Sequence, residues 1–210
     1  MRVIPFEQRS DGWFAARLGV PTASSFDRVI TPTGKPSSQI DALINELIAE
    51  KLTGQRKEIF VTAAMQRGTD LEPEARRFYE FATDNTVEEI GLCLHDTIDA
   101  GASPDGLVGD DGLLEIKCPS APVHVEYLRA GILPPKYKAQ VMGQLWVTDR
   151  KWCDFLSYHP EIKPFCIRVF RDDDFIKTLE LILSEACDTI STYTEQLKGG
   201  DREVVYGSEV

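Results

Sequence analysis

One stretch decides the fold of this chain: SPDGLVGDDGLLEIKCP, from Ser103 to Pro119. Two apolar residues precede a turn of Gly and Asp at 109–112, and a second apolar run follows it, which predicts an antiparallel β-hairpin. Glu115 and Lys117 are two residues apart, so on a strand their side chains project to the same face. Asp105 stands at the start of the partner strand. The hairpin therefore predicts that two carboxylates and an ammonium converge at one point.

This convergence favours a metal site. Close carboxylates repel each other and raise each other's pKa unless a cation lies between them. A small set of hard oxygen ligands suits Mg²⁺ or Mn²⁺. The cationic lysine is a poor ligand, but it can orient or deprotonate a water that attacks a metal-bound phosphate. Pro-Asp-Gly alone is an ordinary turn and Glu-x-Lys alone an ordinary solvated strand face, so their joint occurrence on one hairpin carries the prediction.

The same residues resemble a known signature. Pro104-Asp105 followed by Glu115-Ile116-Lys117 is similar to the PD-(D/E)xK nuclease motif, and the wider string resembles the phage lambda exonuclease family of viral recombinase nucleases. Three further segments match that family in the same order: RLGVPTAS at 17–24, GxxxE at 68–72 and AQVxxxLWVT at 139–148. The resemblance covers about Trp13 to the final helix. It implies a restriction-endonuclease-like α/β core, with a central mixed β-sheet flanked by helices.

The resemblance also implies catalytic roles for five side chains: Asp105, Glu115, Lys117, Glu72 and Gln140. Asp105, Glu115 and the Ile116 carbonyl would hold the first of two Mg²⁺ ions, for which Mn²⁺ can substitute. Glu72 would help Asp105 to hold the second. Lys117 would orient the attacking water, and Gln140 would lie close to the metal centre. From sequence alone, Gln140 passes as a neutral surface residue, and Glu72 as an acid beside a helix N-terminus.

A second group of residues matches the family's pocket for a 5′-phosphate. Arg17 and Ser24 flank the joint between two short predicted helices, where a guanidinium and a hydroxyl could face one anion. On the residues alone, Arg17 is a surface charge and Ser24 a helix-end residue. The family match instead implies that both bind the phosphate of the digested strand. Lys35, in the loop at 31–38, is a further candidate for this pocket.

The charge of the chain is unevenly distributed. The net charge of −11 argues at first against a nucleic-acid partner. However, residues 1–57 carry 8 basic and 6 acidic side chains, whereas residues 172–210 carry 3 basic and 10 acidic ones. An acidic tail on an outer face could help to confine DNA to a basic passage elsewhere. The resemblance implies a homotrimer around duplex DNA, with a single-strand-annealing recombinase as a possible partner.

Length and composition indicate one globular domain over residues 1–210, because 210 residues and 42% hydrophobic content are enough for one well-filled core. We expect a cytosolic protein, since the sequence has neither an apolar signal core nor a membrane-spanning run. The resemblance implies a phage or prophage origin. The five cysteines are widely spaced and show no zinc-ligand spacing, so we expect reduced thiols. The three histidines are isolated, and we expect them at strand ends or on the surface.

Periodicity and turn residues predict the other elements. Helices are expected over 10–19, 22–30, 39–52, 123–131, 134–146 and 173–197, the last ended by Gly199-Gly200. A helical stretch over 59–82 is interrupted by Gly68 and Pro73, which would place Glu72 at a helix N-terminus. Residues 86–100 read as a strand pair, and 152–158 with 165–170 as a hairpin.

The resemblance implies a Mg²⁺-dependent 5′ to 3′ exonuclease acting on double-stranded DNA ends. It would release 5′-mononucleotides and leave 3′ single strands for recombination by strand annealing. A structure-selective or restriction-type endonuclease shares Asp105, Glu115 and Lys117 and stays open as an alternative. A non-catalytic DNA-binding subunit is a third reading, which predicts a broken set of metal ligands. A merely structural hairpin would predict no metal binding.

Overall fold

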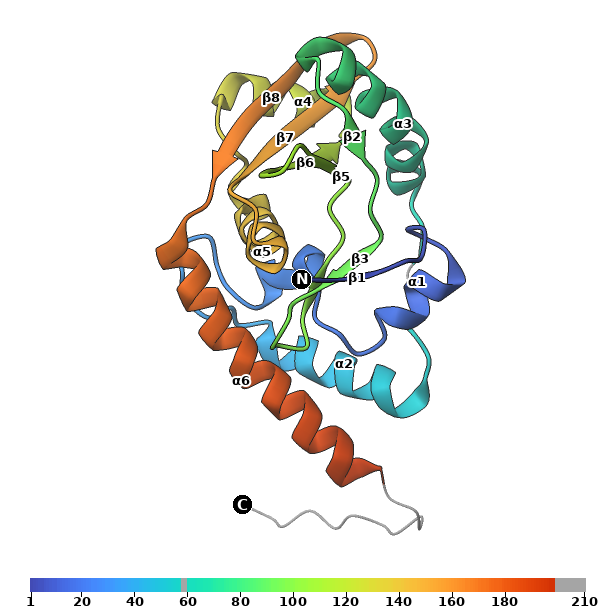
Figure 1. The fold of residues 1–210 in the computed structure, drawn as a ribbon, viewed down its shortest axis with the longest axis vertical. Coiled ribbons are helices and arrows are strands. Elements are labelled where there is room, and N and C mark those ends of the chain that lie inside the picture. The colour runs from blue at the N-terminus through green and yellow to red at the C-terminus, as the bar shows by residue number, and fades with distance from the viewer. Residues whose placement is uncertain (58–59, 199–210) are drawn as a thin grey trace.

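The structure is a computed structural model that describes residues 1–57 and 60–198 (Figure 1). Its centre is a five-stranded sheet of order β2-β5-β6-β7-β8. The bounds of its strands are β2 Val87–Glu88, β5 Gly106–Val108, β6 Gly112–Lys117, β7 Trp152–His159 and β8 Ile162–Phe170. Only β6 and β7 pair in parallel, so the sheet is mixed. The predicted α/β fold class is confirmed.

The central hairpin forms where the sequence predicts it. β5 and β6 are antiparallel, with Val108 opposite Gly112 and Gly106 opposite Leu114. The turn between them starts at Gly109, whose φ of 53° lies in the left-handed region that glycine adopts without strain. Continued by one residue, this register places Asp105, which directly precedes β5, at the position opposite Glu115. The predicted hairpin at 152–158 and 165–170 is also confirmed, as β7 and β8.

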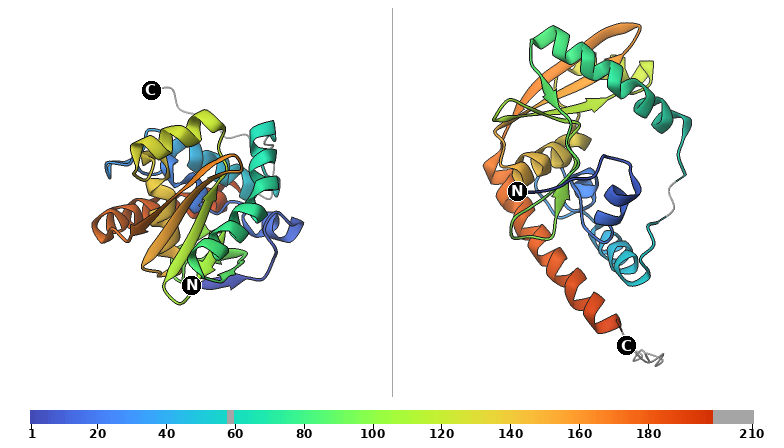
Figure 2. Two further views of the ribbon diagram at one scale, coloured as in Figure 1. Left: turned by 90° about the horizontal axis from the view of Figure 1, so that it is seen from above. Right: turned by 45° about the vertical axis from the view of Figure 1, so that its right-hand side comes forward.

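Helices cover both faces of this sheet, and the strand alternation decides which side chains face which helix. Leu114 and Ile116 of β6 pack with Tyr79 of α3 (Ala63–Thr83) on one face. Leu113 lies on the other face with residues of α5 (Lys138–Thr148). The left panel of Figure 2 shows the sheet between α3 on one side and α4 (Ala121–Ala130) and α6 (Asp173–Leu197) on the other. Glu115 and Lys117 are two and four residues after Leu113 on the same strand, so their side chains point to the same face and toward α5.

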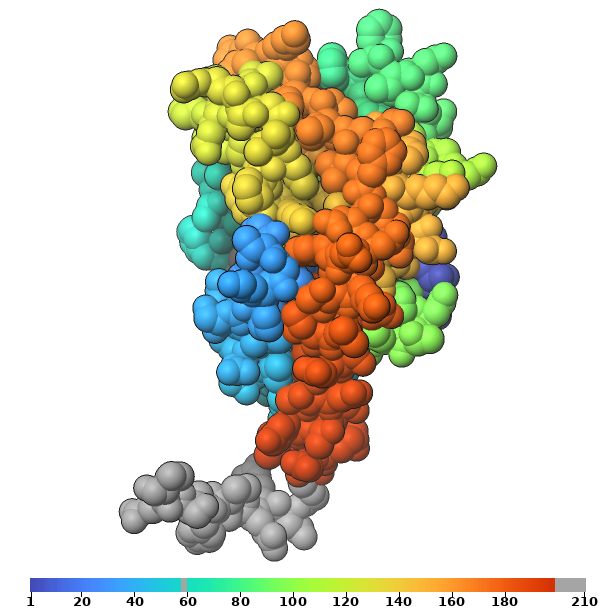
Figure 3. All heavy atoms as spheres, turned by 90° about the vertical axis from the view of Figure 1, so that its left-hand side faces the viewer, coloured from blue at the N-terminus to red at the C-terminus, as the bar shows by residue number. Residues whose placement is uncertain are grey.

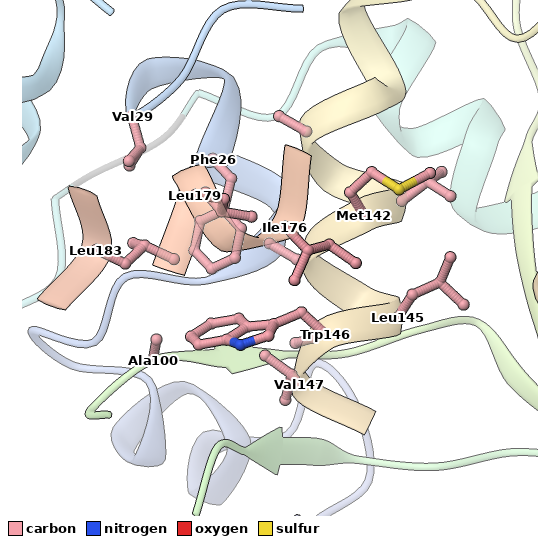
Figure 4. Close-up of a cluster of buried hydrophobic side chains, with 14 of the residues drawn as sticks. Phe26, Val29, Ala100, Met142, Leu145, Trp146, Val147, Ile176, Leu179 and Leu183 are labelled. Carbon is pink, nitrogen blue, oxygen red and sulfur yellow. The ribbon is translucent and has the colours of Figure 1, made fainter. Parts of the chain in front are cut away.

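The main core lies between α5, α6 and the 3-10 helix η1 (Ala23–Arg28) (Figure 4). Phe26 and Trp146 form its aromatic pair, with ring centroids 6.5 Å apart. α5 is buried on nearly every side, from Val141 to Thr148. α6 and η1 enclose the side of α5 that a surface helix would expose. Gln140, near the start of α5, is half-buried.

Two long helices extend away from the sheet. α2 (Ile40–Thr53) ends at Gly54, with φ 66°, as predicted. α6 begins after Asp172, whose side chain accepts a hydrogen bond from the Phe175 N–H at 3.1 Å. Figure 3 shows α6 as a ridge down one side of the molecule, beside the segment around residues 25–40 drawn in blue. The glycines predicted to end α6 lie outside the described residues, as do the last ten residues.

The stretch at 86–100 differs from the prediction. β2 joins the five-stranded sheet, whereas β3 (Leu92–Leu94) lies in a separate sheet with β1 (Arg2–Ile4) and β4 (Gly101–Ala102). The two strands are thus not paired with each other. Gly91 lies between them, and a Cβ added there would come within 2.3 Å of the Phe6 carbonyl oxygen. The chain around Ile4 and Phe6 therefore passes close to the segment that links β2 to β3.

The predicted interruption of the helical stretch over 59–82 is also wrong. α3 is continuous through Pro73, so Glu72 lies within the helix and not at its N-terminus. The helix begins at Ala63 because the Thr62 hydroxyl caps it, accepting from the Met65 N–H at 3.2 Å. Pro73 therefore costs one internal hydrogen bond without ending the helix.

The remaining expectations concern single residues and membrane spans. All five cysteines are free, as predicted. His124 is buried within α4, where its Nδ1 lies 2.7 Å from the Ser157 hydroxyl and its Nε2 3.0 Å from the Lys163 carbonyl, so its expected place at a surface or strand end is wrong. Within residues 1–57 and 60–198, none of the helices combines the length and apolar composition needed to cross a membrane.

Candidate active site

The predicted convergence at the end of the central hairpin is confirmed. The Asp105 carboxylate accepts a hydrogen bond from the Ile116 N–H at 2.6 Å. The Lys117 ammonium contacts the Glu115 carboxylate. The three side chains line one cavity of about 160 Å³, together with Gln140 and Gln144. The catalytic roles of these residues stay a prediction.

Two glutamines of α5 hold Glu115. Gln140 Nε2 donates to Glu115 Oε1 at 2.6 Å, and Gln144 Nε2 donates to Oε2 at 2.5 Å. The glutamines are four residues apart, so they share one face of the helix. Gln144 is fully buried and escaped the sequence analysis, although a polar residue inside the apolar run VMGQLWV was a usable signal. Its Oε1 is buried and has no hydrogen-bonding partner in the described part of the chain.

Burial and mutual repulsion set the protonation of the site. The pKa of Asp105 is raised well above its usual range, first because the carboxyl is buried and then because of the nearby charges of Glu115 and Glu72. Lys117 and the Ile116 N–H oppose this shift. Burial acts to lower the pKa of Lys117, but the charges of Glu115 and Asp105 outweigh it and raise the pKa. The neighbouring carboxylates thus favour the ammonium form of Lys117, which can orient a water by donating a hydrogen bond to it.

Glu72 reaches the same region from α3 but is held by two arginines. Its Oε1 accepts from Arg76 at 3.0 Å, and its Oε2 accepts from Arg9 at 2.5 Å. Arg76 is largely buried, and it also lies 2.8 Å from the Glu89 carboxylate and 3.4 Å from the Asp105 carbonyl oxygen. Arg76 therefore ties Glu72 to the turn that carries Asp105.

The donor set at the hairpin fits a small divalent cation. Among the described residues, His, Cys, Asp and Glu side chains form no group of three or more arranged to hold a metal ion. Mg²⁺ does not need such a group, because it is commonly bound by one or two carboxylates and keeps several waters. Asp105, Glu115 and the Ile116 carbonyl are two carboxylates and a carbonyl of this kind. The carboxylate repulsion that raises the pKa of Asp105 is what a bound cation relieves.

Arg17 and Ser24 lie together, as the sequence predicts. Arg17 Nη2 donates to the Thr22 hydroxyl at 2.8 Å and to the Ser24 hydroxyl at 3.2 Å. The guanidinium also lies over the Trp13 ring, 4.2 Å from its centroid. Burial, and then the charge of Arg56, lower the pKa of Arg17 to about 10. Arg17 is thus a half-buried, charged group at neutral pH with hydroxyls beside it.

These residues line a second cavity, of about 380 Å³, with more basic side chains than the sequence analysis assigned to it. Arg28, Arg56 and Lys57 are also among the lining residues. Arg28 and Lys57 both bind Glu46, which lowers the pKa of that carboxyl to about 2. Lys35 lines none of the three cavities described, so its role in this pocket stays a prediction without support from the geometry.

The two cavities share Arg17 and Ser24. A bound anion at these residues would therefore lie beside the cavity that contains Asp105 and Lys117. A third cavity, of about 630 Å³, adjoins Asp105 and Glu72 from the other side. Its lining includes Glu7, Glu88 and Glu89 as well as Arg9 and Arg76. Because acidic side chains outnumber basic ones in this lining, this cavity is the least suited of the three to bind a nucleic-acid strand.

Comparisons with known proteins match this architecture. Two crystal structures of an alkaline exonuclease, LHK-Exo from Laribacter hongkongensis, align with TM-scores of 0.83 and 0.82. Their identities are 44% and 43%, and each alignment covers 90% of this chain and 96% of that one. The second of these structures is a complex with dAMP.

A phage-related exonuclease from Haemophilus somnus 129PT aligns with a TM-score of 0.66 at 15% identity, over 85% of this chain and 96% of that one, which supports the fold alone. No curated protein matches the chain significantly. The model of the YqaJ-like viral recombinase domain matches residues 12–151. This segment contains the hairpin, Glu72, both glutamines and the Arg17 cavity, and the chain belongs to the family of YqaJ-like viral recombinase domains.

Proposed function

We propose that this protein is a Mg²⁺-dependent 5′ to 3′ exonuclease that acts on double-stranded DNA ends. It releases 5′-mononucleotides and leaves 3′ single strands for recombination by strand annealing. The observation that carries this proposal is the cluster of Asp105, Glu115 and Lys117, with Glu115 held by two glutamines. Family membership and the similarity to an alkaline exonuclease support the nuclease chemistry. We treat residues 1–210 as one nuclease domain.

In the proposed mechanism, Asp105, Glu115 and the Ile116 carbonyl would hold the first Mg²⁺, and Asp105 with Glu72 would hold the second. When bound, the ions polarise the scissile phosphate and lower the pKa of the attacking water. The Lys117 ammonium orients that water by donating a hydrogen bond to it. Gln140 and Gln144 fix the Glu115 carboxylate in place. Glu72 must exchange its contact with Arg9 in order to serve as a ligand.

The Arg17 cavity supports an activity that requires a DNA end. Arg17 and Ser24 offer a guanidinium and a hydroxyl to a terminal 5′-phosphate, next to the cavity that contains Lys117. An endonuclease has no use for a terminal phosphate, so this arrangement favours the exonuclease. The relative that forms a complex with dAMP binds a mononucleotide of the class that the proposed reaction releases.

Linear duplexes labelled at either end, with and without a 5′-phosphate, test the proposal. With Mg²⁺, the wild type should release mononucleotides from the 5′-labelled end and should digest phosphorylated duplex faster. Arg17→Ala should erase the preference for the phosphate. A defined fragment from circular DNA would establish the endonuclease instead. If the preference persists in Arg17→Ala, the phosphate pocket lies elsewhere.

We further propose that three copies enclose the DNA. The basic residues concentrate in the first 57 positions, and the acidic ones after position 172. Three copies could line a passage with N-terminal basic side chains while α6 faces outward or packs between subunits. A trimer that encloses the duplex would stay on it even if each subunit binds DNA weakly. An annealing recombinase in the bacterial cytoplasm is the proposed recipient of the 3′ strand.

A further inference from the structure

Arg9 has a backbone conformation that its side chain does not favour. Its φ of 69° is left-handed, and the other described non-glycine residues with positive φ are Asp84 and Asp149. Those two directly follow α3 and α5, where aspartate is well tolerated in this conformation. Arg9 ends no helix. A left-handed backbone costs a residue of this kind about 1–2 kcal/mol.

The neighbours of Arg9 fix this conformation. Gln8 Nε2 donates to the Ile90 carbonyl at 2.8 Å and to the Pro104 carbonyl at 2.9 Å, which ties the segment to the turn before Asp105. On the other side, Ser10 caps α1 (Asp11–Ala16). The chain between these two anchors turns so that Arg9 lines both cavities that contain Asp105.

The ion pair between Arg9 and Glu72 is too weak to explain why the protein keeps a left-handed backbone at Arg9. Within the described ranges, Glu72 is the hydrogen-bonding partner of the Arg9 guanidinium. The same carboxylate is already bound by Arg76, whose side chain is 12% exposed, whereas that of Arg9 is 48% exposed. An ion pair this exposed contributes about 0–1 kcal/mol, which is less than the strain costs. Stability alone would therefore favour glycine at this position.

We propose that Arg9 exchanges Glu72 for a backbone phosphate of the DNA strand that enters the active site. This inference rests on the proposed function, and it adds a substrate contact to it. The guanidinium fork matches the geometry of a phosphate. Among the described residues, the other cations near Asp105 have other roles, because Lys117 contacts Glu115, Arg76 is buried against Glu72, and Arg17 is proposed to bind the terminal 5′-phosphate. Arg9 is accessible to solvent, and its partner Glu72 would keep its ion pair with Arg76 if Arg9 moved away.

Salt-dependent DNA binding tests this contact without cleavage. A fluorescent 5′-phosphorylated duplex is titrated with protein in EDTA, by anisotropy, over a series of salt concentrations. Four proteins are compared with the wild type: Arg9→Ala, Glu72→Gln, the double variant, and Arg129→Ala as a control. Arg129 is an exposed arginine of α4, outside the three cavities.

Loss of one phosphate contact should reduce the slope of log Kd against log salt by about 0.7–0.9. We expect this reduction in Arg9→Ala relative to the wild type, and again in the double variant relative to Glu72→Gln. Arg129→Ala should keep the wild-type slope. The comparison within the Glu72→Gln background matters because it removes the carboxylate that Arg9 neutralises. If Arg9→Ala changes the slope only when Glu72 is intact, Arg9 merely pairs with Glu72 and the inference is overturned.

Two further outcomes separate a failure of this inference from a failure of the proposed function. A wild type that digests DNA while Arg9→Ala binds it with an unchanged slope overturns this inference and leaves the nuclease intact. A wild type that neither binds nor digests duplex overturns both. Arg9→Gly serves as a second variant, because glycine accepts a φ of 69° without strain. It should melt no lower than the wild type and should show the same reduced slope, so misfolding cannot account for the result.

Discussion

Gln144→Leu should change the free energy of unfolding little while it impairs metal binding and cleavage. Gln144 and Glu115 are each 1% exposed, and the hydrogen bond between them is 2.5 Å long. Losing a hydrogen bond to a charged group costs about 1.5–3 kcal/mol. The substitution also removes the buried Gln144 Oε1, which has no partner in the described structure, and this relief returns about 1–3 kcal/mol. The free energy of unfolding should therefore change by less than about 2 kcal/mol.

The effect on the metal site should be larger. Without Gln144, one oxygen of Glu115 has no fixed donor, and loss of a group that orients a metal ligand typically lowers metal affinity about 10–100-fold. Calorimetric titration with Mg²⁺, thermal denaturation and the cleavage rate measure the three effects. Gln140→Leu is the matched control, since water can replace this half-exposed donor and the loss should be smaller. Unchanged Mg²⁺ affinity and cleavage in Gln144→Leu would refute the proposed role of the glutamine.

Three other predictions follow from the structure. Tyr79→Phe removes the hydroxyl that donates to the buried Asp154 at 2.7 Å on the sheet face opposite the site, so denaturation should show a loss of about 1–3 kcal/mol while cleavage stays unchanged. Asp172→Ala should cost about 1 kcal/mol as a lost helix cap. The Phe175 N–H lowers the pKa of Asp172, so the wild-type advantage is present above the unfolded pKa and disappears as pH falls through the lowered folded value; a constant difference down to acid pH would contradict this. Light scattering should give three times the 23.5 kDa chain mass, and a monomer that digests processively would refute the ring.

Local patterns were sufficient to predict the central hairpin. The two-residue period of a strand places Glu115 and Lys117 on one face, whatever surrounds them. The same holds for α2 and α6, whose start or end depends on a cap such as Gly54 or Asp172. These features depend on residues within a few positions of each other, and such contacts are visible in a sequence.

Features that depend on distant contacts were not predicted. Nothing near residues 86–100 reveals that β2 and β3 join different sheets, because their partners lie elsewhere in the chain. Gln144 became part of the site only because α5 lies against the face of β6 that carries Glu115. The left-handed backbone of Arg9 is imposed by the anchors of Gln8, one of which is the Pro104 carbonyl. In each case the decisive partner is far away in sequence.

One comparison tests the central claim, that Lys117 acts at a nuclease site built on the β5–β6 hairpin. Lys117→Ala and Lys163→Ala, an exposed lysine of β8, are incubated with Mg²⁺ and 5′-phosphorylated linear duplex, and DNA binding is measured in parallel. Lys117→Ala should bind DNA but cut it at least about 10²-fold more slowly, the usual cost of removing one electrostatic group from such a site. Lys163→Ala should cut at the wild-type rate. Wild-type cleavage by Lys117→Ala would contradict the account.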